Sequence, residues 1–171
     1  FHKECLSLAN LGFEVYLIVA DGKGNETISG IKIIDSGYQK NRIKRLFLSV
    51  HNAYYVAKMI NADIYHFHDP DLLYAGKRLK NSKNQVFFDS HEDFPALMLQ
   101  RDYIPKLFRR PLYYLAKSFE IYYSRRISGI VTVTDKIANK FKSYGVKRIQ
   151  IIKNYPILSL TQTPNFDKDN N

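Results

Sequence analysis

The chain has 171 residues, 45% of them hydrophobic and 25% charged, which is enough for one domain with a sizeable core and too short for two typical domains. Its formal net charge of +10 favours an anionic partner, and nucleic acid, an anionic membrane surface and a phosphorylated substrate are the alternatives. The single cysteine, Cys5, excludes an internal disulfide framework and fits a reducing compartment, so we predict a cytoplasmic protein. The sequence has no signal-peptide pattern and no run of about 18 apolar residues, so we do not expect it to span a membrane.

The first third of the chain alternates helix and strand signals. Residues 1–11 repeat apolar side chains at three- and four-residue steps and are followed by Gly12, which predicts a helix with a glycine cap. Residues 15–20 are a continuous apolar run, typical of a strand covered on both faces, and residues 31–34 predict a second short strand. Residues 43–60 return to helical spacing and predict a long amphipathic helix.

The alternation continues to the end of the predicted domain. Further strands are expected at residues 64–68, 86–88, 130–133 and 149–152, with helices at 72–79 and 136–144. Strands separated by helices imply right-handed crossovers and an open sheet. We therefore predict an α/β fold, Rossmann-like and three-layer αβα, with a mostly parallel sheet. The domain spans residues 1–157, and the polar residues 158–171 read as a linker or disordered tail.

Two clusters of polar residues follow predicted strands, where parallel sheets bind their ligands. In the first, strand alternation puts His66 and His68 on one face, and Asp69 and Asp71 come next. The carboxylates could instead cap the following helix, and a histidine could be a core residue with its hydrogen bonds satisfied. We select His68 and Asp69 as candidate acceptor- or substrate-binding residues.

The second cluster occupies residues 89–93. A histidine beside carboxylates can be held in one tautomer, which suits hydrogen bonding to sugar hydroxyls or acid–base catalysis. We select His91 as a candidate catalytic residue and Glu92 and Asp93 as candidate substrate-binding residues, the alternative being a solvated loop with a helix cap. The histidines of both clusters could form a mixed metal site, but none of their spacings is an established ligand pattern on a helix, so we predict no metal.

Residues 101–126 are rich in basic and aromatic side chains. Such a basic amphipathic helix is typical of a membrane-surface segment, and its periphery would reach anionic headgroups. The basic residues expected to face the membrane are Arg109, Arg110, Lys117, Arg125 and Arg126. The same composition also fits nucleic acid, or an ordinary helix with a core stripe and a solvated charged face. We expect an anionic membrane surface as a partner and no nucleic acid.

Several motifs, taken in order, resemble family 4 glycosyltransferases of bacterial polysaccharide assembly. They are FHKECLSLANLGFEV at the start, then ADIYHFHDPDLL, FDSHED, GIVTVT and IKNYP. The resemblance implies one half of a GT-B fold, in which two Rossmann-like halves face a cleft, and makes this chain the amino-terminal, acceptor-side half. It implies retaining transfer of a sugar from a nucleotide-sugar donor to a glycan or lipid-linked acceptor, with no cofactor and no obligatory metal.

The resemblance also suggests roles for individual residues. His91 matches a strand-end histidine near the transferred sugar, and Glu92 and Asp93 line the same loop. His68 and Asp69 match the acceptor-side loop. The basic aromatic segment matches the region through which many relatives approach the inner face of the plasma membrane, so the protein is expected there as a peripheral protein.

Two parts of the family pattern lie outside this sequence. The first strand and its loop would precede Phe1, and the donor-binding half would follow the tail, after a crossing segment at residues 154–156. We expect the full-length protein to be a glycosyltransferase of the hexosyltransferase type and this chain alone to be inactive. The alternatives are a non-catalytic Rossmann-like module that binds an anionic ligand or RNA, and a nucleotide-binding enzyme such as a sugar epimerase. The lack of a G-x-G-x-x-G motif and of the aromatic motif of RNA-binding sheets weakens both.

Overall fold

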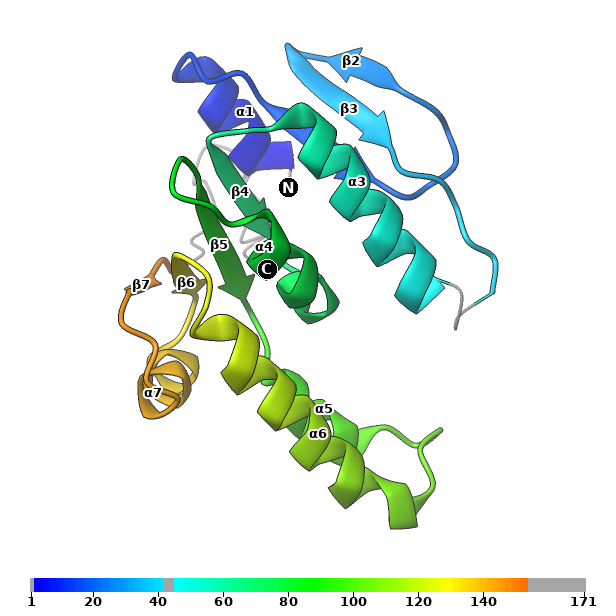
Figure 1. Ribbon diagram of the computed structural model, residues 1–171, viewed down its shortest axis with the longest axis vertical. Helices are drawn as coiled ribbons and strands as arrows, with labels where there is room; N and C mark the ends of the chain where they lie inside the picture. Colours follow the sequence, from blue (N-terminus) through cyan, green and yellow to red (C-terminus); the bar gives the residue numbers. More distant parts are fainter. Residues whose placement is uncertain (1, 42–44, 154–171) are drawn as a thin grey trace, which may run out of the picture.

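The computed structural model describes residues 2–41 and 45–153. Its helices are α1 (His2–Asn10), η1 (Arg45–Ser49), α3 (Val50–Ile60), η2 (Pro70–Leu72), α4 (Leu73–Leu79), α5 (Phe94–Gln100), α6 (Lys106–Ser124) and α7 (Asp135–Ser143). Its strands are β1 (Tyr16–Val19), β2 (Glu26–Ile28), β3 (Ile31–Asp35), β4 (Ile64–Phe67), β5 (Gln85–Ser90), β6 (Gly129–Thr132) and β7 (Ile149–Ile151). Figure 1 shows the strands interleaved with helices along the chain, as the sequence predicts.

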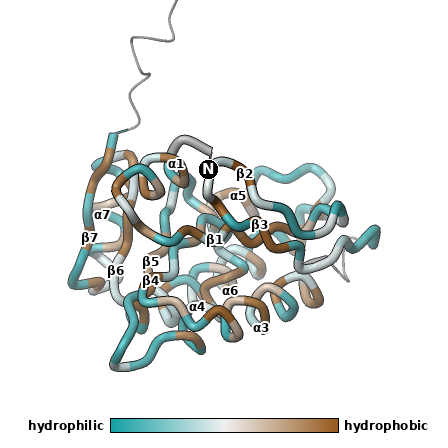
Figure 2. Tube along the Cα trace, turned by 90° about the horizontal axis from the view of Figure 1, so that it is seen from above, coloured by the Kyte–Doolittle hydropathy of each residue, from teal (hydrophilic) through white to brown (hydrophobic). Residues whose placement is uncertain are grey.

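The strands form a Rossmann-like arrangement in which most pairs are parallel. β4, β5, β6 and β7 make an all-parallel sheet in that order, and β1 pairs in parallel with β3 in a second sheet that β2 completes. Figure 2 shows α1 on one side of the strands and α3, α4 and α6 on the other, which gives three layers. The predicted class, an α/β fold with a mostly parallel sheet, is confirmed. We expected a single open sheet. Among the described residues the strands instead form two hydrogen-bonded sheets, one with β1 and the other with β4 as an edge strand.

The sequence reading missed strand β2. All three of its residues are exposed, so it carries no apolar run. It pairs antiparallel with β3 through a two-residue turn, because Ile28 lies opposite Ile31 in the register. Ser29 and Gly30 between them both have positive φ, 51° and 80°, which is the backbone that a tight hairpin of right-handed twist requires.

The predicted helices differ from the observed ones mainly at their ends. Of the helix expected at 43–60, the structure describes the part from Arg45 to Ile60, in which the π-helix η1 runs into α3. The glycine expected to cap α7, Gly145, has a φ of 80°, and the following amide of Val146 donates to the carbonyl of Phe141, which ends the helix. The predictions for residues 154–156 and 158–171 lie outside the described residues.

The core lies on one face of the four-stranded sheet. Phe88 of β5 is 2% exposed and packs against Phe67 of β4 and Phe141 of α7, with Leu73 of α4 in the same cluster. Side chains alternate along a strand, so His66, next to Phe67 in β4, and Asp89, next to Phe88 in β5, point to the opposite face of the sheet. The polar site begins on that face.

Candidate functional site

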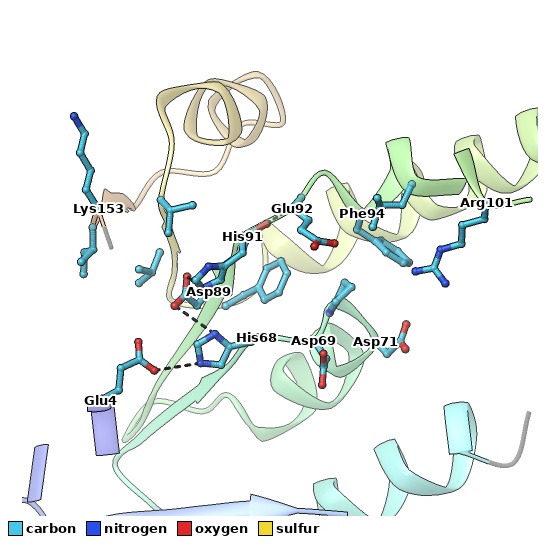
Figure 3. A pocket seen from close by; sticks show the side chains of 17 residues that line it. Glu4, His68, Asp69, Asp71, Asp89, His91, Glu92, Phe94, Arg101 and Lys153 are labelled. Carbon is cyan, nitrogen blue, oxygen red and sulfur yellow. Dashed lines mark hydrogen bonds and ion pairs between the residues drawn. The ribbon is translucent and has the colours of Figure 1, made fainter. Parts of the chain in front are cut away.

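A pocket of about 950 Å³ opens at the carboxyl ends of the parallel strands (Figure 3). Its polar lining comes from α1, from the last residues of β5, from the segments after β4, β5 and β7, and from the residue that follows α5. These residues are Glu4, His68, Asp69, Asp71, Asp89, Ser90, His91, Glu92, Arg101 and Lys153. Parallel α/β sheets place ligands at this edge, so the pocket is the candidate site for a substrate.

Asp89, at the end of β5, is the centre of the polar cluster. Its side chain is 5% exposed, and its Oδ2 lies 3.5 Å from His66 Nε2 and 3.4 Å from His68 Nδ1. Its Oδ1 lies 3.2 Å from His91 Nε2. The rings of His66 and His68 stack with their centroids 4.9 Å apart. One buried carboxylate therefore gathers three imidazoles from two neighbouring strands.

The charges of this cluster depend on burial and on one another. Burial alone would raise the pKa of Asp89, but the imidazoles of His66, His91 and His68 outweigh it and hold the pKa below its ordinary value of 3.8. Burial, followed by the charge of His66, lowers the pKa of His68 from 6.5, although Asp89 and Glu4 oppose the change. At neutral pH the cluster therefore contains an ionised Asp89 beside a neutral His68.

His91 is the most accessible member of the cluster within the pocket, with its side chain 42% exposed. With Nε2 directed at Asp89, Nδ1 is left to exchange a hydrogen bond or a proton with a ligand. Two buried hydroxyls hold the chain beside it, because Thr132 donates to the carbonyl of Ser90 and Ser90 donates to the carbonyl of Glu92. Both flanks of His91 are thus fixed to the sheet.

The structure brings four of the five predicted substrate-site residues to the pocket. His68, Asp69, His91 and Glu92 line it, and Figure 3 shows His68 between Glu4 and Asp89. Asp69 is the N-cap residue of η2, but its side chain makes no capping hydrogen bond. Burial, followed by the neighbouring Asp69, raises the pKa of Asp71.

The fifth residue, Asp93, does not line the pocket and instead caps a helix. Its carboxylate accepts a hydrogen bond from the amide of Ala96 and caps α5, and it lies 3.4 Å from Lys140 Nζ. Lys140 Nζ also lies 3.0 Å from both carboxylate oxygens of Glu120, which is fully buried in α6. This group, Asp93, Lys140 and Glu120, ties the start of α5 to α6 and α7 below the pocket.

Helix α6 presents apolar side chains to the solvent. The exposed fractions of Leu107, Phe108 and Leu115 are 80%, 55% and 66%, while Glu120 on the opposite side is buried. Phe119, Ile121 and Tyr123 of the same helix pack against the core, so α6 carries apolar side chains on both its packed and its solvent-facing sides, whereas an ordinary surface helix has a charged solvated face. We call Leu107, Phe108 and Leu115, with Tyr114 and Tyr122, the exposed face of α6.

The five basic residues that were expected to face a membrane have three kinds of surroundings. Arg109 donates from Nε to the carbonyl of Ile104, and Arg125 donates to the carbonyl of Tyr144, so both make contacts within the domain. Arg110 is exposed beside the exposed face. The two other predicted residues lie over tyrosine rings, Lys117 at 5.9 Å from the centroid of Tyr113 and Arg126 at 3.6 Å from that of Tyr122.

Six of the polar residues that line the pocket were not selected from the sequence, among them Asp71 and Ser90. Asp89 stands in the second cluster, and its central place follows only from the register that sets Phe67 opposite Phe88. Lys153 follows the last strand, so the strand-end rule could have found it. Glu4 and Arg101 reach the pocket from helices, and nothing in their sequence positions indicates this.

The parallel α/β layers, with a polar pocket at the strand ends, define a Rossmann-like α/β domain. The family model described as Glycosyltransferase Family 4 matches residues 2–155, and the chain therefore belongs to this family of glycosyltransferases. No curated protein matches the chain at a significant level. Among the residues described by the structure, no helix has both the length and the hydrophobicity to cross a membrane.

Proposed function

We propose that this domain is the acceptor-side half of a retaining glycosyltransferase that acts in cell-surface polysaccharide synthesis. The enzyme transfers a sugar from a nucleotide-sugar to a glycan or lipid-linked acceptor and requires no cofactor or metal for the reaction. The observation that carries the proposal is the pocket in which Asp89 orients His91 at the strand ends of a family 4 domain. The family membership favours this enzyme over an RNA-binding module.

The pocket residues suit a polyhydroxylated acceptor. Asp69 and Glu92 offer carboxylate oxygens that accept hydrogen bonds from hydroxyl groups, and Arg101 and Lys153 offer donors from α5 and from the segment after β7. His91, fixed at Nε2 by Asp89, presents Nδ1 to the transferred sugar or to the hydroxyl that attacks. The donor half and the first strand, which the resemblance places outside this sequence, stay predictions.

The test of this function is sugar transfer by the full-length protein with a panel of nucleotide-sugars and membrane extract. His91→Ala should lower the rate by about 10²-fold or more, the range of a lost acid–base or hydrogen-bonding group. His51→Ala is the matched control, because His51 lies on α3 outside the pocket, and its rate should equal that of the wild type. An unchanged rate in His91→Ala removes this residue from the mechanism, and no transfer from any donor contradicts the proposal.

We further propose that the exposed face of α6 docks on an anionic membrane on the inner face of the plasma membrane, where lipid-linked acceptors reside. Leucine and phenylalanine side chains at more than half exposure gain free energy by entering the acyl boundary. Arg110 and Arg126 lie beside them and would meet anionic headgroups, each basic residue adding about 1 kcal/mol near such a surface.

Vesicle sedimentation of the full-length protein tests the docking. Leu115→Glu should weaken binding to phosphatidylglycerol vesicles by about tenfold or more, because it removes an exposed leucine that would enter the bilayer and adds a charge. Ser82→Glu adds the same charge at an exposed position between α4 and β5, outside α6, and should have a smaller effect. Equal effects of the two variants would show that charge alone determines binding and would contradict docking through the apolar face.

A further inference from the structure

Three potential metal ligands lie together on the face of the sheet opposite the core. His66 and His68 come from β4 and from the residue after it, and Asp89 comes from β5. The donor atoms His66 Nε2, His68 Nδ1 and Asp89 Oδ2 all lie within 4.8 Å of one another. Strand alternation and the parallel register of β4 and β5 produce this grouping. The three ligands come from two strands, so they do not show the sequence spacing of metal ligands on a helix.

The distances fit a small divalent ion. Zinc bonds to imidazole nitrogen and carboxylate oxygen at about 2.0–2.2 Å, so the ligand atoms of a tetrahedral site are about 3.3–3.5 Å apart. Asp89 Oδ2 already lies 3.5 Å from His66 Nε2 and 3.4 Å from His68 Nδ1. Only the separation of the two nitrogens has to shorten. The ring of His66 can rotate to do so because its side chain is 35% exposed.

The outer partners are also those of a metal site. A ligating histidine usually directs its second nitrogen at a carboxylate, and a ligating carboxylate is itself hydrogen-bonded. His68 Nε2 lies 3.5 Å from Glu4 Oε2, and His91 Nε2 lies 3.2 Å from the second oxygen of Asp89.

We propose that His66, His68 and Asp89 bind one divalent transition-metal ion of the zinc class. Two imidazoles and one carboxylate select zinc, cobalt or nickel over magnesium and calcium, which prefer oxygen ligands. A metal bound at Asp89 Oδ2 leaves Oδ1 facing His91 and the pocket. The site shares His68 and Asp89 with the pocket, but the transfer reaction proposed above needs no metal, and the test of metal binding does not depend on that reaction.

Titration calorimetry of the metal-free, full-length protein with Zn²⁺ tests the site, with Co²⁺ absorption spectroscopy reporting coordination. The wild type should bind one Zn²⁺ ion per chain at this site, show visible cobalt bands typical of four-coordination, and bind Mg²⁺ at least 100-fold more weakly than Zn²⁺.

His66→Ala should weaken zinc binding at least tenfold and abolish the cobalt bands. His51→Ala, which removes a histidine outside the cluster, should behave as the wild type. His66→Gln provides a second variant if His66→Ala does not fold, which circular dichroism will show. No saturable zinc binding in the wild type, or equal affinity in the wild type and the folded His66 variant, would overturn the proposal.

Discussion

Removing the ammonium group of Lys140 should be among the most damaging single changes to this domain outside its apolar core. Lys140 Nζ lies 3.0 Å from both oxygens of the fully buried Glu120 and 3.4 Å from Asp93, and the side chain of Lys140 is itself only 13% exposed. In Lys140→Met the carboxylate of Glu120 loses its cation in an environment where water cannot replace it. Breaking a buried pair from one side costs about 3–5 kcal/mol. For a domain of this size that lowers the unfolding midpoint by about 6–20 °C, at about 2–4 °C per kcal/mol.

Thermal unfolding followed by circular dichroism measures this effect at pH 7 and again at pH 5. The loss should be smaller at pH 5, because the unpaired Glu120 can take up a proton and no longer leaves a buried charge. Lys142→Met removes an exposed lysine from the same helix and should change the free energy of unfolding by no more than about 0.5 kcal/mol. Adding Glu120→Leu to Lys140→Met should restore most of the stability, since an apolar pair leaves no buried charge. A loss below about 1 kcal/mol in Lys140→Met, or equal losses in the Lys140 and Lys142 variants, would refute the reasoning.

Three further predictions concern stability. In Gly76→Ala the new Cβ would lie 2.6 Å from Phe67 Cε1 and 2.8 Å from Cζ, so calorimetry should show a loss of about 1–3 kcal/mol, and Phe67→Leu should reduce that loss when the two are combined. Thr134 accepts a hydrogen bond from the amide of Ile137 as the N-cap of α7, and Thr134→Ala should cost about 1 kcal/mol in chemical denaturation, whereas Thr134→Ser should cost less. Burial, against the opposing charge of Lys140, raises the pKa of Glu120 above its ordinary 4.5, so its contribution to stability should fall as pH rises from 4.5 through the folded pKa. Glu120→Gln should remove that slope from the pH profile of stability, and an unchanged slope would contradict it.

The sequence predicts the strands and helices that bury apolar residues, because their periodicity reflects burial directly. The runs 86–88 and 130–133 became β5 and β6, shifted by a residue or more at their ends. β2 carries no such signal, since a strand of three exposed residues exists only because β3 offers it an edge. Its turn residues Ser29 and Gly30 were the one local sign of it.

The candidate site was predictable in part. The rule that ligands bind at the carboxyl ends of parallel strands led to His68, Asp69, His91 and Glu92, all of which line the pocket. The rule says nothing about which side chain stands at the centre. Asp89 has that place because the register of β4 and β5 fixes its neighbours, and a register is a relation between segments that no single segment encodes.

Asp93 and α6 also show that contacts between distant segments cannot be predicted from one segment alone. Lys140, which pairs with Asp93, lies 47 residues away in the sequence, so local reasoning could weigh a helix cap but not the ion pair. The apolar positions of α6 were visible in the sequence, but periodicity does not tell a face that packs on a core from one that stays exposed. The structure shows that Leu107 and Leu115 are exposed and that Glu120 is buried.

The most direct test of the central claim, that this pocket holds the acceptor, is steady-state kinetics of the full-length protein with Asp69→Asn and Glu92→Gln. Both residues line the pocket, and each variant keeps the size of the side chain while it weakens the hydrogen bonds to acceptor hydroxyls. We predict that the KM for the acceptor rises about tenfold, the equivalent of about 1.4 kcal/mol, while the KM for the nucleotide-sugar changes less than about twofold. Asp63→Asn, before β4 and outside the pocket, should change neither value. A rise confined to the KM of the nucleotide-sugar would contradict the account and assign this pocket to the donor.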